Sequence, residues 1–458
     1  MNIKLFEHIY LIGIGGIGMS ALARFFLSQN KKVYGYDKVK TSLTSDLENQ
    51  GIEITYDDNV DNLPSRFTEE KDNRLVIYSS AISKNNIFSF FNERGFSICK
   101  RAEALGSISK FYYTIAIAGT HGKTTTSVML SHILKNSKID CTAFFGGISK
   151  NYGSNFLLSN DSNYLVVEAD EYDKSFLTLN PDIAVITSLD ADHLDIYDSH
   201  QEFVDTFQQF ILQIKKNGTL IIEESIVKYF EKPKNLKLLT YSTSSSSDYF
   251  VSDINQQNNS YHFNYISKKQ NSKSKKIILP MLGEHNVSNA LAAISVSCLL
   301  NIDYEKIYDS FSNFEGINRR FDIHISNNKV VYVDDYAHHP EEIRSTICGF
   351  LSSFPQRKLT VIFQPHLFTR TRDFANDFAK SLSEADKLIL LDIYPAREKP
   401  IKGINSQMLL DLCSNDCKMV LDKKELLNHI ERNENDLVMT LGAGDISDLV
   451  APIKRILN

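Results

Sequence analysis

Short apolar runs that end in glycine or in polar residues recur along the chain and predict a parallel α/β fold. The first run, HIYLI at residues 8–12, leads into a glycine turn, a helical pattern over GMSALARFFLSQN and a second apolar run, KVYGYD. This alternation indicates parallel strands joined by helices. Later runs, among them YTIAIAG, NYLVVEADE, KLTVIFQPH and DLVMTLGAGD, also carry polar residues at their C-terminal ends. Because ligands of open α/β sheets bind beyond the C-terminal ends of the strands, we expect the functional residues there.

Interruptions of this pattern divide the chain into three predicted domains. We place the first at residues 1–107, the second at residues 108–318 and the third at residues 319–458. The stretch 242–276 is rich in Ser, Asn, Gln and Lys, which favours loops and an exposed hairpin.

Length and composition fit a globular protein of several domains. The 458 residues, 42% hydrophobic and 23% charged, exceed what one ordinary core accommodates. The net charge of −6 argues against a nucleic-acid partner. No apolar run approaches the length of about 18 residues typical of a membrane span. We therefore expect a cytoplasmic protein, with its six cysteines reduced and not arranged as a zinc site.

The first glycine turn matches a nucleotide-binding fingerprint. Gly13, Gly15 and Gly18 satisfy G-x-G-x-x-G between a strand and a helix, and Asp37 follows at the end of the next strand. Glycines let the backbone approach a pyrophosphate, whose charge the helix N-terminus favours. This pattern specifies only a diphosphate and a ribose. The NAD-type cofactor of an oxidoreductase, a UDP-sugar and a turn without a ligand therefore all remain open.

A second glycine turn, GTHGKTT at residues 119–125, has the layout of a shortened phosphate-binding loop. The usual motif has a glycine five residues before Gly122, and that position is Ile117. Lys123 is placed to reach the β- and γ-phosphates, and the Thr124 hydroxyl to bind Mg²⁺. The alternative is a glycine turn with an exposed lysine.

Acidic residues at the ends of two other apolar runs favour the phosphate-loop interpretation. EADE ends one run and DADHLD ends another, and we expect Glu168 and His193 near a Mg²⁺ ion, which prefers oxygen ligands. GEHNVSNALAA then opens a helix with Asn286 and Asn289 in its first turns. Asn binds the edge of adenine, although Asn286 could instead cap the helix.

Together these motifs resemble those of the Mur ligases, the ATP-dependent amide-forming enzymes of peptidoglycan synthesis. The resemblance covers nearly the whole chain and rests on GIGGIGMSALA, GTHGKTTT, EADE, DADHLDIY, GEHNVSNALAA, NRRFD, DDYAHHPEEI, FQPHLFTRTRDF and LGAGDI, in that order. The family uses the shortened G-x-x-G-K-T loop, which would make Ile117 an ordinary buried strand residue. The resemblance implies an N-terminal Rossmann-like UDP-binding domain, a central P-loop-type ATPase domain with a parallel sheet, and a C-terminal Rossmann-like domain.

The implied reaction joins an amine to a carboxylate through an acyl phosphate. ATP would phosphorylate the lactyl carboxylate of UDP-N-acetylmuramate, and the amine of L-alanine would attack the product. Leu367 and Phe368 replace the Arg-Tyr of many alanine-adding members, and Tyr172 stands where Ser is frequent. These departures leave one alternative, in which a recycled tripeptide is attached to the same sugar nucleotide. The expected cofactors are ATP and Mg²⁺, and the expected state is a monomer or weak homodimer.

The resemblance also implies a role for each residue that matches a family motif. The implied catalytic residues are Lys123, Glu168, His193, His338 and Arg370. The implied ATP-binding residues are Gly119, Thr120, His121, Gly122, Lys123, Thr124, Thr125, Asn286, Asn289, Arg320 and Asp335. The implied UDP-sugar-binding residues are Gly13, Gly15, Gly16, Gly18, Asp37 and Ser80. The implied metal ligands are Thr124, Glu168 and His193. His338 or His339 would help to deprotonate the alanine ammonium, with His366 nearby, and Arg370 would bind the alanine carboxylate.

Overall fold

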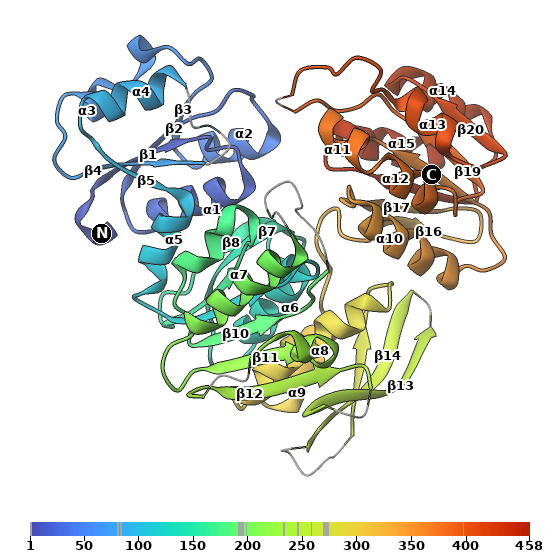
Figure 1. Cartoon of the computed structure of the whole chain (residues 1–458), viewed down its shortest axis with the longest axis horizontal. Coiled ribbons are helices and arrows are strands. Elements are labelled where there is room, and N and C mark those ends of the chain that lie inside the picture. The colour runs from blue at the N-terminus through green and yellow to red at the C-terminus, as the bar shows by residue number, and fades with distance from the viewer. Residues whose placement is uncertain are drawn as a thin grey trace. The chain divides into compact units, whose positions relative to one another are not determined.

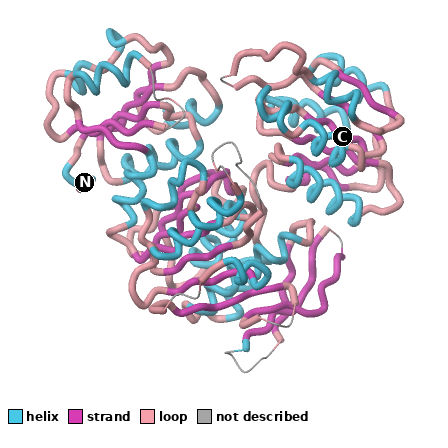
Figure 2. Tube along the Cα trace, viewed as in Figure 1, coloured by secondary structure: helices cyan, strands magenta, loops and turns pink. Residues whose placement is uncertain are grey.

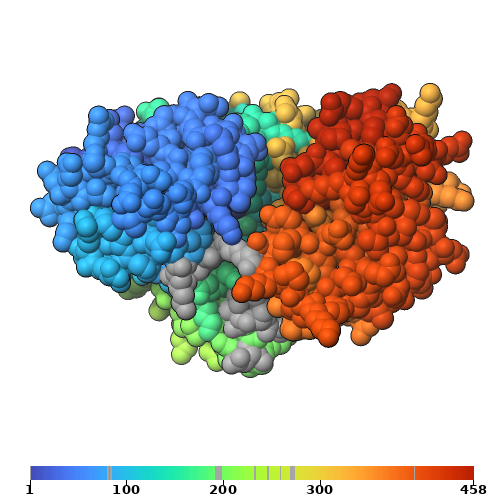
Figure 3. Space-filling view, turned by 90° about the horizontal axis from the view of Figure 1, so that it is seen from above, coloured from blue at the N-terminus to red at the C-terminus, as the bar shows by residue number. Residues whose placement is uncertain are grey.

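Two compact units make up the chain in the computed structural model. The first unit comprises Met1–Asn255, His262–Leu279 and Val287–Glu315, and the second comprises Gln256–Tyr261, Pro280–Asn286 and Gly316–Asn458. The structure describes residues 2–79, 82, 85–190, 197, 199–231, 234–244, 247–257, 259–268, 274–396 and 398–458. The other positions are grey in Figure 1, Figure 2 and Figure 3. The predicted boundary at residues 107 and 108 lies inside the first unit, and the three-domain boundaries stay a prediction.

A five-stranded parallel sheet forms the N-terminal part of the first unit, with strand order β3-β2-β1-β4-β5 (Figure 1). Its strands are β1 (His8–Ile12), β2 (Lys32–Tyr36), β3 (Glu53–Thr55), β4 (Arg74–Tyr78) and β5 (Ser97–Lys100). Its helices are α1 (Ile17–Ser28), α2 (Ser42–Asn49), α3 (Ser65–Thr68), α4 (Asn86–Glu93) and α5 (Arg101–Ser109). Ile9 and Leu11 join one buried cluster, whereas Tyr10 and Ile12 join another, so β1 is covered on both faces. The strand order reverses between β1 and β4, which places the first glycine turn at the switch point where such sheets bind ligands.

The central sheet of the first unit has ten strands in the order β15-β14-β13-β12-β11-β10-β6-β9-β7-β8. Its strands are β6 (Tyr113–Ala118), β7 (Thr142–Ser149), β8 (Ser154–Leu157), β9 (Tyr164–Glu168), β10 (Ile183–Ile186), β11 (Thr219–Glu223), β12 (Lys237–Ser242), β13 (Tyr249–Gln257), β14 (Ser260–Ser267) and β15 (Lys275–Leu279). Its helices are α6 (Lys123–Lys135), α7 (His200–Leu212), α8 (His285–Leu299) and α9 (Tyr304–Ser312). The strands around the second glycine turn, β9, β6, β10 and β11, run parallel.

The polar stretch predicted to form loops and an exposed hairpin contributes two long strands to this sheet. In β14 every second residue is buried, including Tyr261, Phe263 and Tyr265. Ser260, His262, Asn264 and Ile266 occupy the alternate positions, so the apolar period of two is hidden in the overall composition. The expectation of loops was therefore wrong for most of this stretch.

The second unit contains a six-stranded sheet in the order β16-β17-β21-β18-β19-β20, in which only β16 is antiparallel to its neighbour. Its strands are β16 (Asp322–Ser326), β17 (Val331–Asp335), β18 (Leu359–Phe363), β19 (Lys387–Leu390), β20 (Cys417–Val420) and β21 (Leu437–Leu441). Its helices are α10 (Pro340–Ser353), α11 (Phe368–Asp373), α12 (Ala375–Leu382), α13 (Ser406–Leu412), α14 (Lys423–Arg432) and α15 (Val450–Leu457). Val361 and Ile362 belong to different buried clusters, so this sheet also has a core on each face. Parallel strands in all three sheets confirm the predicted α/β class.

At no point in the described ranges does a helix combine the length and the apolar character that a membrane span requires.

Candidate active site

The predicted phosphate loop joins β6 to α6 at the C-terminal edge of the central sheet. Gly119 has φ of 128° and Gly122 has φ of 79°, which L side chains rarely adopt. A Cβ atom on Gly119 would lie 2.2 Å from the Thr187 hydroxyl, so the loop approaches the end of β10 too closely for a side chain. Ile117 is fully buried within β6, which confirms that the loop is shortened and begins at Gly119.

The Lys123 ammonium is held by the loop and by a buried carboxylate. Its Nζ donates to the Gly119 carbonyl at 2.7 Å and to Oε1 of Glu171 at 2.7 Å. The Glu171 side chain has no exposed surface. Burial alone would lower the pKa of Lys123, but the carboxylates of Glu171, Asp170 and Glu168 raise it. Lys123 is therefore a cation.

Two of the three predicted metal ligands are in direct contact. The Thr124 hydroxyl at the start of α6 donates to Oε2 of Glu168, the last residue of β9, at 2.9 Å. The Gly146 N–H donates to the same carboxylate oxygen at 2.8 Å and fixes its position. A hydroxyl beside a carboxylate is the oxygen chemistry that Mg²⁺ prefers, so these residues fit the ion. The third predicted ligand, His193, lies outside the described residues, as do Asp192 and Asp195.

The segment after β10 braces the phosphate loop through hydrogen bonds that sequence reasoning missed. The Thr187 hydroxyl donates to the His121 carbonyl, and Ser188 Oγ accepts the His121 N–H at 2.9 Å. Thr120 Oγ1 accepts the Asp190 N–H at 3.0 Å and donates to the Asp190 carbonyl at 3.1 Å. The small polar residues directly after an apolar run were the available signal, because this position faces the adjacent loop of a parallel sheet.

The remaining predicted ATP residues of the first unit lie on the helices beside the loop. Thr125 is buried in the first turn of α6. Asn289 on α8 accepts a hydrogen bond from the Thr126 hydroxyl at 3.4 Å, and its Oδ1 lies 2.2 Å from the position of a Cβ on Gly122. Asn289 thus packs directly against the phosphate loop.

Asn286 belongs to the second unit, and its side chain forms a hydrogen bond with the backbone four residues earlier. Its Nδ2 donates to the Leu282 carbonyl at 2.7 Å, and the residue is buried. A helix cap would instead accept an N–H through Oδ1, so this hydrogen bond is not the capping contact considered from the sequence.

The first glycine turn holds the residues predicted to bind the UDP-sugar, apart from Ser80, which lies outside the described residues. Gly13 has φ of 86°, and its N–H donates to the Tyr36 carbonyl at 2.7 Å. The Gly15 N–H donates to Oδ2 of Asp37 at 2.8 Å, which ties the end of β2 to the turn. Gly16 and Gly18 follow at the start of α1. These residues therefore gather at one edge of the N-terminal sheet.

The second unit positions Asp335 at the end of β17. Its Oδ2 accepts the Phe321 N–H at 2.6 Å, and its Oδ1 accepts the Ala337 N–H at 2.8 Å. Burial raises the pKa of this carboxyl to about 6, and the nearby Arg320 opposes the rise. Arg320 also lies over the Tyr336 ring, 5.4 Å from its centroid. Asp335 therefore organises the turn around Arg320, whatever it binds in addition.

Two histidines and an arginine come together in the same unit. The rings of His338 and His366 are 6.1 Å apart. Burial lowers the pKa of His366 to about 4, with help from His338 and Arg370, and burial also lowers the pKa of His338. Nδ1 of His366 and Nη1 of Arg370 are buried without a hydrogen-bond partner in the described chain. Buried polar atoms of this kind call for a ligand or water. The ring of the neighbouring His339 packs against Phe374 with centroids 4.9 Å apart.

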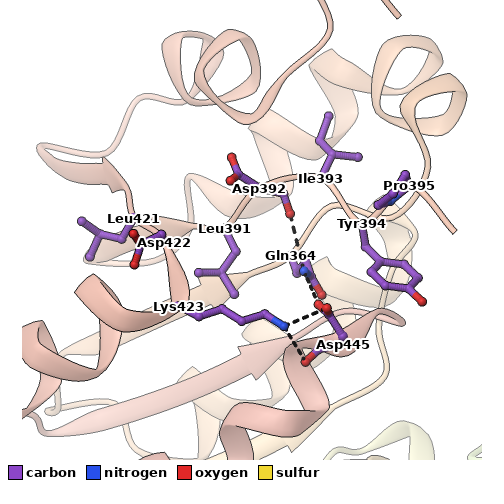
Figure 4. A pocket seen from close by; sticks show the side chains of 10 residues that line it. All are labelled: Gln364, Leu391, Asp392, Ile393, Tyr394, Pro395, Leu421, Asp422, Lys423 and Asp445. Carbon is purple, nitrogen blue, oxygen red and sulfur yellow. Dashed lines mark hydrogen bonds and ion pairs between the residues drawn. The ribbon is translucent and has the colours of Figure 1, made fainter. Parts of the chain in front are cut away.

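A pocket of about 290 Å³ opens beside this group at the C-terminal edge of the sheet (Figure 4). Tyr394 lines it and stacks on His366 with ring centroids 5.7 Å apart. Asp445 lies at its floor, where it meets the Lys423 ammonium at 2.8 Å and Gln364 Nε2 at 2.8 Å. The lining residues are Gln364, Leu391, Asp392, Ile393, Tyr394, Pro395, Leu421, Asp422, Lys423 and Asp445. This set contains no residue that the sequence assigned to the site.

The fold and these sites define a nucleotide-dependent α/β enzyme of the ligase type. Three family models match the chain: the Mur ligase family catalytic domain at residues 8–113, the Mur ligase middle domain at residues 117–297 and the glutamate ligase domain of Mur ligases at residues 319–444. The chain therefore belongs to the Mur ligase family, as the sequence motifs indicated.

Full-length relatives carry the same family signature. The UDP-N-acetylmuramate–L-alanine ligase of Parabacteroides distasonis is 42% identical over 458 residues, which cover 100% of this chain and 98% of the relative. The UDP-N-acetylmuramate–L-alanine ligase of Flavobacterium psychrophilum is 44% identical, and the match covers 100% of both chains.

Solved structures share the fold. The UDP-N-acetylmuramate-alanine ligase of Thermotoga maritima has a TM-score of 0.80 at 26% identity, covering 98% of each chain. The murein peptide ligase of Psychrobacter arcticus has a TM-score of 0.73 at 22% identity, also over 98% of each chain. The latter likeness concerns the fold alone.

Proposed function

We propose that this protein joins L-alanine to the lactyl carboxylate of UDP-N-acetylmuramate at the expense of ATP, giving UDP-N-acetylmuramoyl-L-alanine, ADP and phosphate. The observation that carries this proposal is the contact of Lys123 and Thr124 with the acidic end of β9, in a chain whose full-length relatives are alanine-adding ligases. By this proposal the protein works in the cytoplasm, as a monomer or weak homodimer, in the synthesis of peptidoglycan precursors.

The activation step has to bring two anions together. A carboxylate is a poor electrophile because it is negatively charged and lacks a leaving group, and ATP converts it to an acyl phosphate. Lys123 would neutralise the transferred phosphate, and the N–H groups of the shortened loop would orient it. Thr124 and Glu168 would hold Mg²⁺, with His193 as a further ligand, and when bound the ion supplies charge neutralisation at the phosphates.

Residues of the second unit would bind L-alanine and prepare its amine for attack. His338 or His339 would take a proton from the alanine ammonium, and burial lowers the pKa of His338, so its imidazole is neutral near pH 7. Nη1 of Arg370, buried without a hydrogen-bond partner among the described residues, suits the alanine carboxylate. Arg320 and Asp335 would contribute to ATP binding from the same unit.

The test is phosphate release from ATP and Mg²⁺ in the presence of UDP-N-acetylmuramate, with L-alanine, other amino acids and L-Ala-γ-D-Glu-diaminopimelate added separately. Release that needs both the sugar nucleotide and L-alanine supports the proposal. Release only with the tripeptide would assign the protein to peptide recycling. No release with any acceptor would show that the motifs preserve the fold without this chemistry.

A further inference from the structure

Arg101, which the motif analysis did not single out, lies against the first glycine turn. It is the first residue of α5 and follows directly on the C-terminal end of β5. A Cβ atom on Gly18 would lie 2.9 Å from Nη1, 3.2 Å from Cδ and 3.4 Å from Cζ of Arg101. The third glycine of the fingerprint therefore makes room for a guanidinium, and not only for close packing between helix and strand.

The electrostatic setting of this guanidinium is unusual. It lies at the first turns of both α1 and α5, where helix dipoles favour anions and disfavour cations. Its ion pair with Asp170 measures 3.5 Å, longer than the 2.7–2.9 Å typical of a charge-assisted hydrogen bond. Within the described chain the guanidinium forms no hydrogen bond, and its side chain is 26% exposed. Its donors are therefore available to an incoming anion.

The glycine turn itself has one donor fewer to offer. The Gly15 N–H already donates to the Asp37 carboxylate at 2.8 Å. A diphosphate at this turn would meet that carboxylate as a like charge, and a cation beside Gly18 would offset the repulsion. Arg binds phosphate oxygens through two parallel N–H donors, which suits this position better than a point charge would.

We propose that Arg101 binds the diphosphate of the UDP-sugar, and that Asp170 holds the guanidinium near the turn while the site is empty. This inference rests on the proposed function, since it needs a nucleoside diphosphate at the first glycine turn. Asp170 stands between Glu168 and Glu171 in EADE, so Arg101 links the sugar-nucleotide turn to the strand end that faces the phosphate loop. Arg101 would thereby help to aim the lactyl carboxylate of the bound substrate at the ATP site.

The chain provides a matched control in the preceding residue. Lys100, the last residue of β5, forms an ion pair of 3.4 Å with Asp173, which likewise joins the start of α5 to the turn after β9. Both members are more than two-fifths exposed, and the atoms nearest to a Cβ on Gly18 all belong to Arg101 and not to Lys100. A purely structural link between the segments would therefore make Lys100 and Arg101 equivalent.

The experiment compares full-length wild-type protein with Arg101→Ala, Arg101→Lys, Lys100→Ala and Asp170→Asn by calorimetric titration with UDP-N-acetylmuramate, UDP and ATP. We expect Arg101→Ala to weaken binding of both uridine nucleotides ~10- to 100-fold, as for loss of a hydrogen bond to a charged group. The affinity for ATP should stay within about twofold, because Arg101→Ala removes only the partly exposed ion pair with Asp170 from the neighbourhood of the phosphate loop, and such a pair contributes little. The affinity of Arg101→Lys for the uridine nucleotides should lie between those of the wild type and Arg101→Ala. This variant replaces Arg101→Ala in the comparison if the latter fails to fold. Lys100→Ala should match the wild type, and Asp170→Asn should bind UDP at least as tightly.

Unchanged UDP binding by a folded Arg101→Ala variant would overturn the inference while leaving the proposed function intact. Equal weakening by Lys100→Ala or Asp170→Asn would overturn it too, since that result indicates a structural link. Wild-type protein that binds neither UDP nor UDP-N-acetylmuramate would overturn both the inference and the proposed function.

Discussion

The Lys123 ammonium lies 2.7 Å from the Glu171 carboxylate, and the Glu171 side chain is completely shielded from solvent. The cation proposed to meet the phosphates is thus held by an anion of the protein itself. Beside this ion pair, the Thr124 hydroxyl donates a hydrogen bond to the Glu168 carboxylate. In the proposed function, phosphate binding would exchange these contacts for contacts with the nucleotide.

Removing the Glu171 charge should destabilise the protein. Glu171→Gln leaves a buried ammonium without its counter-ion, a change that costs about 3–5 kcal/mol in other proteins. The thermal unfolding midpoint should fall accordingly. Glu202→Gln is the control, because Glu202 pairs with Lys174 at 2.8 Å but both side chains are over one-third exposed, and such pairs contribute about 0–1 kcal/mol. Equal midpoints for the two variants would contradict a stabilising role for the buried pair.

Lys123→Ala should abolish turnover without preventing sugar-nucleotide binding. We expect phosphate release to drop at least ~100-fold, as on removal of one group that stabilises transition-state charge. Titration should still detect UDP-N-acetylmuramate, because its proposed turn lies on the N-terminal sheet. Lys135→Ala is the control at the other end of α6, where Lys135 pairs with Asp140 at 2.9 Å. Turnover retained by Lys123→Ala would remove Lys123 from the mechanism.

Sequence patterns located the phosphate loop because its chemistry depends on neighbours along the chain. Ile117, Lys123 and Thr124 have their positions fixed by one strand, one turn and one helix start. Glu168 could also be predicted from the sequence, because it is the polar residue that ends an apolar run. Its hydrogen bond with Thr124 agrees with that reasoning.

Contacts across the fold could not be predicted in this way. Glu171 reaches Lys123 only because the chain turns sharply after it, with positive φ at Asp173 and Lys174, which are not glycines. Arg101 meets Gly18 from a segment more than 80 positions away in the sequence. Neither relationship follows from composition or spacing, because each depends on how separate elements pack.

Asp335 should make the stability of the protein depend on pH in a direction unusual for a carboxyl group. Its pKa is raised by burial to about 6, from an ordinary value of 3.8. The native state then holds its proton at a pH where the unfolded chain has lost it. This contribution to stability is full below pH 3.8 and is lost as pH rises to about 6, above which it changes no further. Asp335→Asn should remove this dependence, measured as unfolding midpoints from pH 4 to pH 7.

Asp445→Asn is the matched control within the same unit. Burial alone would raise the pKa of Asp445, but its hydrogen bonds from Lys423 and Gln364 lower it. Its contribution is therefore present above pH 3.8 and lost only in more acidic solution, so Asp445→Asn should leave the dependence between pH 4 and pH 7 nearly unchanged. If both variants changed the pH dependence in the same direction, the raised pKa of Asp335 would be refuted.

Leu367→Gly should stabilise the protein and impair the use of L-alanine. Leu367 has φ of 72° and ψ of 136°, a conformation that strains a residue with a Cβ atom by about 1–3 kcal/mol. Glycine relieves that strain, at a cost of about 0.4–1 kcal/mol through the freer unfolded chain. Because Leu367 connects His366 to the helix that carries Arg370, the looser backbone should raise the KM for L-alanine while the KM for ATP stays unchanged.

Leu412→Gly, at the exposed end of α13, should only destabilise, by up to about 1 kcal/mol. An unfolding midpoint that falls as far for Leu367→Gly as for Leu412→Gly would show that the strain is not stored there.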